Sequence, residues 1–139
     1  MANNFNAMPG LLKMLTAMGF GMLAWVVASV FSGGLSIFGQ NVSTSDWWES
    51  GAGFLCLPAA LLMAGSAILM LCRSRYGRPA HIAGWVAINM AVFIGIKRIG
   101  IHSSMFIPAM SFNAALIVGI SLYLYLSKSI RNYFLAVTD

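Results

Sequence analysis

The sequence predicts an all-α integral membrane protein, built as a four-transmembrane-helix bundle with both termini in the cytoplasm. The first observation is composition: 60% of the 139 residues are hydrophobic and only 8% are charged, whereas about a quarter of the residues in a soluble domain are charged. The second is a set of four apolar runs of about the length that a bilayer requires. The third is an uneven distribution of the eight Lys and Arg residues between alternate connecting segments. The length allows one domain, residues 1–139.

The four runs follow one another with short polar connections. The first predicted span, residues 14–38, comes after a polar lead-in and can cross the membrane with some tilt. The second span covers residues 52–72, the third residues 80–96 and the fourth residues 104–126. Residues 127–139 combine cations with apolar side chains, so we expect an amphipathic tail along the membrane surface.

The cations predict the orientation. Cytoplasmic segments of membrane proteins are enriched in Lys and Arg, and one set of alternate segments holds six of the eight: Lys13, Arg73, Arg75, Arg78, Lys128 and Arg131. We therefore place both termini and the 73–78 turn in the cytoplasm, and expect Arg73, Arg75, Arg78, Lys128 and Arg131 to mark topology and contact lipid headgroups. The opposite loop, residues 39–51, contains Trp47 and Trp48, which we expect to anchor the chain at the interface.

Lys97 and Arg98 lie on the side that should be poor in cations, and three interpretations stay open. They can extend to the outer headgroups at the end of the third helix, where cations suit the helix dipole. They can pair with Asp46 and Glu49, which the threading places on the same side. They can also form an outward-facing anion or partner site together with His102.

Small residues recur every three or four residues in every span, as expected for helices that approach closely in lipid. The expected packing stripes are Ala17, Gly21, Ala24 and Ala28; Ala60, Ala64 and Ala67; Ala83, Ala87, Ala91 and Gly95; and Ser111, Ala115 and Gly119. Asn89 and Asn113 lie at matching depths in an antiparallel pair of helices, so they can meet and hydrogen-bond. Each points away from its own stripe, which favours protein cover on two faces. Trp25, in the middle of the first span, fills a void or lines a cleft.

Groups that carry chemistry are scarce. The spans contain no Asp or Glu, which disfavours proton-coupled exchange. His81 is expected at an interface beside Pro79, on the opposite membrane face from His102, so the two cannot share one haem. The sequence has no zinc-binding pattern. We therefore predict no catalytic residue, no metal site and no cofactor.

Together these features predict a small non-enzymatic multi-pass protein of a bacterial cytoplasmic (inner) membrane that acts through intramembrane protein–protein contacts. It would be an accessory or assembly subunit, or an immunity-type protein. Its expected partners are the lipid bilayer and either further copies of itself or a larger membrane protein. Nucleic acid is not expected, because the cations lie at helix ends rather than along one stripe. The alternative is a self-assembling small-solute transporter, channel or holin-like pore, with Asn89, Asn113 and Trp25 along the path.

Overall fold

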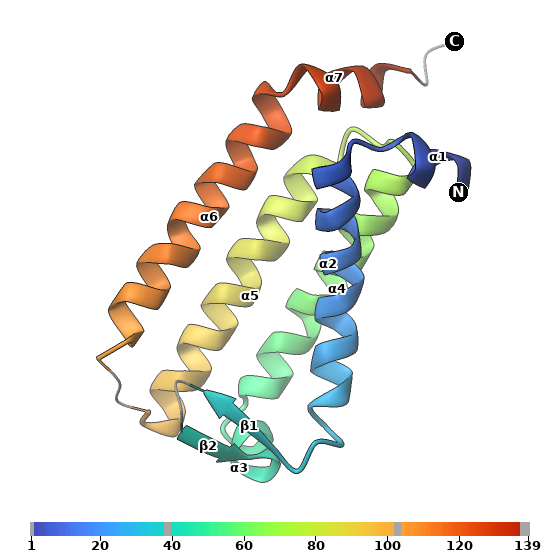
Figure 1. Cartoon of the computed structure of the whole chain (residues 1–139). Coiled ribbons are helices and arrows are strands. Elements are labelled where there is room, and N and C mark those ends of the chain that lie inside the picture. Colours follow the sequence, from blue (N-terminus) through green and yellow to red (C-terminus); the bar gives the residue numbers. More distant parts are fainter. Residues whose placement is uncertain (1, 38–39, 102–103, 137–139) are drawn as a thin grey trace.

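The computed structural model describes residues 2–37, 40–101 and 104–136. In chain order the elements are α1 (Ala2–Ala7), α2 (Gly10–Ala28), β1 (Gly34–Ile37), β2 (Gln40–Ser43), α3 (Thr44–Glu49), α4 (Ala52–Leu71), α5 (Gly77–Ile99), α6 (Phe106–Leu126) and α7 (Lys128–Leu135). Four of them, α2, α4, α5 and α6, are long and apolar enough to cross a membrane. The prediction of a multi-pass, membrane-embedded chain is confirmed at this level. Figure 1 shows α1, α7 and the α4–α5 turn at one end of these helices, and β1, β2 and α3 at the other.

The first span ends ten residues earlier than predicted. Residues 14–38 were expected to form one helix, but α2 runs from Gly10 to Ala28 and β1 begins at Gly34. The Ser29 hydroxyl donates to the Val26 carbonyl at 2.6 Å, competing for the backbone at the helix end. Gly33 then takes a positive φ of 68°, which glycine adopts without steric cost. The serines and paired glycines of this stretch end the helix despite its apolar character.

The segment between α2 and α4 folds into a cap over the helix ends. Strands β1 and β2 pair antiparallel, with Gly34 opposite Ser43. The Ser43 hydroxyl then accepts from the Asp46 amide at 3.0 Å and caps α3. Trp47, expected to anchor at the interface, is instead fully buried against α4 and α5. An indole buried at the end of a helix pair contributes more apolar contact than one lying at the headgroups.

Helix α4 is the centre of the fold and packs most closely against α5 and α2. Its predicted stripe of Ala60, Ala64 and Ala67 is buried. On α5, a Cβ added to Gly84 would lie 2.6 Å from the Met63 sulfur, and one added to Gly95 would lie 2.6 Å from the Ala52 Cβ. The backbones of α4 and α5 therefore meet through glycine, as helices in lipid commonly do.

The stripes predicted on the first and fourth spans are not the main packing faces. All four small residues of the α2 stripe are exposed, and α2 instead buries Leu12, Leu15 and Gly19. The α6 stripe is exposed as well. On α5 the predicted stripe is buried in part: Ala91 and Gly95 are buried and Ala83 is exposed, while Gly84, outside the stripe, makes the second close approach to α4. Small residues occur on more than one face of these helices, and larger apolar neighbours decide which face is buried.

Helix α6 lies at the edge of the bundle and is held mainly at its two ends. Near β1 and β2, the Phe106 ring lies 5.4 Å from the Phe93 ring of α5, centroid to centroid. At the other end Leu124 is buried, the one fully buried residue among those described in α6. Ser127 is extended, so the chain turns there and α7 crosses the end of the bundle (Figure 1). Between these ends Ile117 and Ile120 are partly buried against the core, while Phe112, Leu116 and Val118 are exposed, so the middle of α6 is only loosely packed.

Candidate functional site

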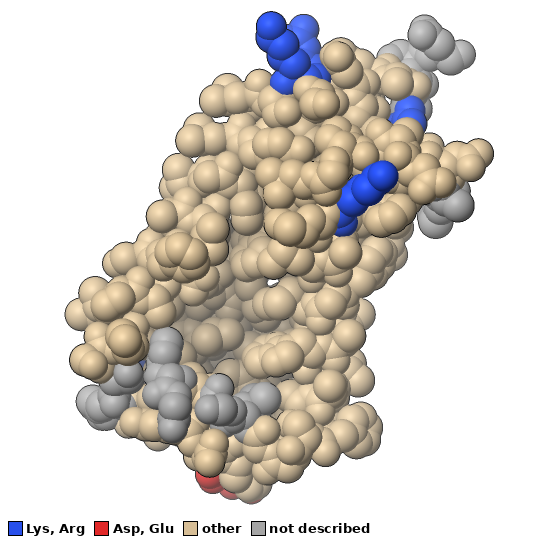
Figure 2. Space-filling model, in the orientation of Figure 1, with Lys and Arg blue, Asp and Glu red and all other residues tan. Residues whose placement is uncertain are grey.

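Three cavities follow one side of α6 and share lining residues, and we call them together the α6 groove. The cavity nearest the cap has a volume of about 450 Å³, and Ile96 also lines the middle cavity of about 240 Å³. Trp85 lines both the middle cavity and a third one of about 410 Å³ between α2 and α6. Figure 2 shows the surface hollowed between α6 and α2 in the half toward the cap. The walls are mostly apolar, and the polar lining residues discussed below are Asn89, Asn113 and Lys97.

Asn89 and Asn113 face the groove together. Both line its middle cavity, and both line a cavity of about 170 Å³ on the other side of the α5–α6 contact. The structure therefore brings the two asparagines to one depth, as the sequence predicted. The expected hydrogen bond between them is not formed, because the Asn89 amide donates to the Trp85 carbonyl of its own helix at 2.9 Å. Asn113 makes no hydrogen bond with any described residue.

Trp25 was grouped with the asparagines, and the structure separates them. Its side chain is 42% exposed on α2. It lines neither of the two cavities that hold Asn89 and Asn113.

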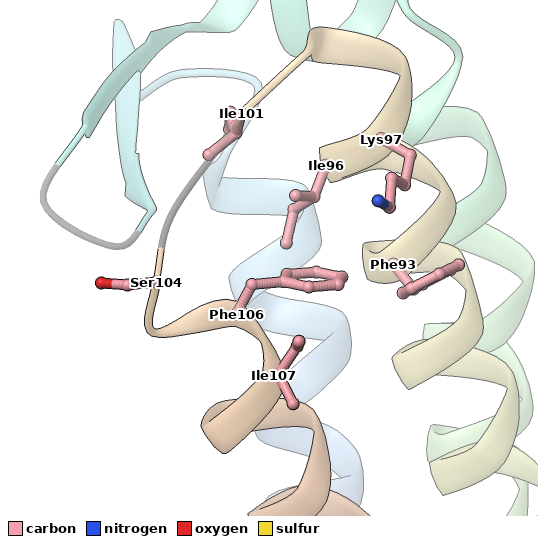
Figure 3. A pocket seen from close by; sticks show the side chains of 7 residues that line it. All are labelled: Phe93, Ile96, Lys97, Ile101, Ser104, Phe106 and Ile107. Atoms are coloured by element: carbon pink, nitrogen blue, oxygen red, sulfur yellow. The ribbon is translucent and has the colours of Figure 1, made fainter.

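Lys97 and Arg98 point to different places. The Lys97 ammonium lies 5.5 Å from the centroid of the Phe106 ring, and Figure 3 shows it directed into the cavity between Ile96 and Phe106. Arg98 instead donates from Nη1 to the Ser50 carbonyl, at 3.1 Å, where α3 ends. Among the described residues neither cation forms an ion pair with Asp46 or Glu49, so the structure does not support that interpretation. His102, the third member of the predicted site, lies outside the described residues.

The turn between α4 and α5, residues 73–78, contacts α7, and we call it the arginine turn. The Arg73 guanidinium lies 4.8 Å from the centroid of the Tyr133 ring and donates to the Ala136 carbonyl at 3.2 Å. The Arg78 guanidinium lies 4.2 Å from the centroid of the Phe134 ring. Burial raises the pKa of Tyr133, and Arg73 partly opposes the shift. These two arginines are thus occupied by protein in addition to any role at headgroups.

Three further cations of this end, Arg75, Lys128 and Arg131, are exposed. Arg75 donates to the hydroxyl of its neighbour Tyr76 at 2.7 Å and makes no described contact with α7. Lys128 and Arg131 are exposed on α7, on the side opposite its buried Ile130 and Tyr133. All three are exposed, and their contact with lipid headgroups stays a prediction.

A buried polar chain between α4 and α5 was not predicted. His81, expected at an interface, is fully buried. Trp85 donates from Nε1 to His81 Nε2 at 3.1 Å, so the ring proton lies on Nδ1 and points to the Ser66 hydroxyl at 2.9 Å. Ser66 in turn donates to the Met63 carbonyl at 2.7 Å. Both ring nitrogens are occupied, which makes His81 a packing residue. The sequence signal for this contact was the i, i+4 spacing of His81 and Trp85, which makes the two side chains neighbours on a helix.

The described residues contain no group of three or more His, Cys, Asp or Glu that could hold a metal ion. The candidate site is therefore the α6 groove with its asparagine pair and Lys97. Comparison of the chain with known protein families, characterised proteins and solved structures gave no match.

Proposed function

We propose that the protein is a non-enzymatic multi-pass component of a bacterial cytoplasmic membrane that acts by docking α6 against another membrane protein. Both termini are proposed to face the cytoplasm. The support for this orientation is the excess of Lys and Arg at the end that carries α1, α7 and the α4–α5 turn, with Asp46 and Glu49 at the opposite end. An accessory or assembly subunit, or an immunity-type protein, fits this description.

Asn113 is the observation that carries the proposal. It lies near the middle of α6, half-buried between the groove and the cavity of about 170 Å³ on the other side of the α5–α6 contact, and without a hydrogen bond to any described residue. Hydrocarbon offers an amide no partner, and an unpaired amide costs about 1–3 kcal/mol in protein mutational data. A polar group from a partner helix that approaches from the side of this smaller cavity would satisfy Asn113 and give a hydrogen bond of about 0.6–2 kcal/mol.

The looseness of α6 agrees with a docking role. Helix α4 buries residues along most of its length, whereas α6 leaves Phe112, Leu116 and Val118 exposed in its middle. A helix held at its ends can accept a neighbour along its centre without unpacking the rest of the chain. Because lipid tails are as apolar as these side chains, the polar Asn113 is what favours protein over lipid at this point.

The test is native mass spectrometry of the full chain after gentle extraction from its own membrane at endogenous expression. We expect a stoichiometric complex with a different membrane protein, weakened about tenfold or more by Asn113→Leu, as the loss of about 1.4 kcal/mol would produce. Ser121→Ala is the matched control, because the Ser121 hydroxyl already donates to the Ile117 carbonyl of its own helix at 2.7 Å. A bare monomer, or a complex indifferent to Asn113→Leu, would refute the proposal.

A self-assembling transporter, channel or holin-like pore is the second candidate. It is favoured by the cavities that lie on both sides of Asn89 and Asn113 and place two amides along one potential path. The same mass spectrum would then contain a closed oligomer of this chain alone. Solute flux into liposomes that contain only the purified protein should fall with Asn89→Leu and Asn113→Leu, and flux that survives both changes would exclude this function.

A further inference from the structure

We propose that the α6 groove binds an anionic membrane lipid, with the headgroup phosphate at Lys97 and one acyl chain lying along α6. The cavity at the cap end is lined by Phe93, Ile96, Ile101, Phe106 and Ile107 besides Lys97 and Ser104. Figure 3 shows the Ser104 hydroxyl pointing away and the Lys97 ammonium pointing in. A cation that faces an apolar cavity, with no described carboxylate in ion-pair contact, matches a ligand that joins an anion to a hydrocarbon chain.

The groove has the length of a chain from one leaflet. It continues from Lys97 through Ile96 to the middle cavity, which ends at Trp85. The twelve residues from Lys97 to Trp85 span about 18 Å of helix, and half of the hydrocarbon core is about 15 Å thick. Val92, Met110 and Ile88 give most of this path apolar walls that suit an acyl chain. Asn89 and Asn113 also line it, but Asn89 already donates to the Trp85 carbonyl, and Asn113 also borders the cavity of about 170 Å³ on the other side of the α5–α6 contact, from which the partner is proposed to approach.

The dimensions favour a lipid over a helix. The two cavities, of about 450 and 240 Å³, are close to the range of about 300–1,000 Å³ that small-molecule sites occupy. A transmembrane helix is a cylinder about 10–12 Å across, which calls for a wider opening than cavities of this size. Lys97 lies in the last turn of α5 and is exposed, so its ammonium can reach the headgroup level.

Arg98 explains why Lys97 is the one cation among the described residues that line the cavity. Its guanidinium is directed to the Ser50 carbonyl at the end of α3, away from the cavity. The neighbouring charges therefore separate into one that completes the cap and one that is available to a ligand. Arg98 is for this reason a matched control for Lys97.

The experiment uses the purified full chain, stripped of lipid in detergent. Phosphatidylglycerol or phosphatidylcholine with identical acyl chains is added, and retained lipid is counted by native mass spectrometry. We expect the wild-type protein to prefer phosphatidylglycerol. Lys97→Gln should reduce its retention about fivefold, the effect of one partly exposed ion pair, whereas Lys97→Arg should preserve it and Arg98→Gln should leave it unchanged.

A second variant tests the chain-binding part of the groove. Ala109 lines the middle cavity, and Ala109→Phe should fill it and lower the retention of both lipids while Lys97 stays in place. Equal thermal unfolding of the variants establishes that each one folds. Retention unaffected by Lys97→Gln or by Ala109→Phe would overturn the proposal, and so would displacement of the lipid by inorganic phosphate alone or occupation of the groove by a copurifying protein helix. The assay contains only this chain and defined lipids, so its result is independent of the partner proposed above.

Discussion

Arg73 adopts an unfavourable backbone conformation, and the contacts of its side chain explain why the protein retains it. It follows α4 with a φ of 54°, in the left-handed region. The Ser74 amide donates to the Leu69 carbonyl at 2.8 Å and the Arg73 amide to the Met70 carbonyl at 3.0 Å, a helix ending in which glycine usually takes this position. An L-residue there costs about 1 kcal/mol relative to glycine. Such strain persists where the side chain has a role, and here that role is to hold α7.

The contacts of Arg73 with α7 set the expected magnitude. A cation–π contact near the surface contributes about 0.5–1 kcal/mol, and the hydrogen bond to the Ala136 carbonyl contributes about 0.5–1 kcal/mol more. Arg73→Gly removes both but relieves about 1 kcal/mol of backbone strain. The free energy of unfolding of the whole chain should therefore change little, while α7 alone loosens. Arg73→Ala loses the contacts and keeps the strain, so it should be about 1 kcal/mol less stable than Arg73→Gly.

Hydrogen exchange followed by mass spectrometry separates the two effects. Exchange of the α7 amides should become about 5–30-fold faster in both variants, the factor that corresponds to 1–2 kcal/mol. Thermal unfolding in detergent should rank Arg73→Gly above Arg73→Ala. Arg75→Ala is the control, because Arg75 packs on Tyr76 and not on α7. Unchanged protection of α7, or an alanine variant as stable as the glycine one, would refute this account of the turn.

Two further predictions concern the contact between α4 and α5. Gly95→Ala should lower stability by about 1–3 kcal/mol, because the new Cβ would lie 2.6 Å from the Ala52 Cβ, whereas Gly119→Ala meets nothing within 4 Å and should be tolerated. Thermal unfolding compares the two, and equal melting temperatures would mean that the helices do not approach through glycine. His81→Phe should cost about 1–3 kcal/mol by leaving the Trp85 indole N–H unpaired. The double change His81→Phe with Trp85→Phe should recover part of that loss, and strictly additive losses would show that the hydrogen bond contributes nothing.

The number and approximate position of the apolar helices could be predicted because hydropathy is a local property. The predicted bounds of the second and fourth spans lie within two residues of the ends of α4 and α6, which is the usual uncertainty of helix ends. The predicted end of the first span was wrong because hydropathy and turn-forming residues favour different structures there. Residues 29–38 are apolar enough to continue a helix, yet serines and paired glycines turn the chain into β1. Turn chemistry decides the boundary in such a stretch, and a hydropathy window does not register it.

Packing faces were harder to predict, because they depend on which helices become neighbours. Spacing alone placed Asn89 and Asn113 at one depth, since depth follows from the helical rise. It could not tell that α2 would bury Leu12 and Gly19 in place of its small-residue stripe. The choice depends on α4, which receives Gly19 against the Met63 carbonyl. A stripe indicates that close approach is possible, and the partner surface determines whether it occurs.

The contacts of the charged side chains were also hard to predict from the sequence. Counting cations treats Lys97 and Arg98 as a pair, but α5 continues to Ile99, and adjacent residues on a helix point about 100° apart. Lys97 and Arg98 therefore face different surfaces, Lys97 the groove and Arg98 the cap. The arginine turn behaves similarly. A rule based on charge number assigns it to one end of the bundle, whereas the side chains of Arg73 and Arg78 pack on the aromatic rings of α7.

The same two arginines also hold the end of α6, which forms one wall of the groove, because α7 is joined to α6 through Ser127 and packs at Leu124. Loosening α7 should consequently widen the space at that end before it disturbs the contact between α4 and α5.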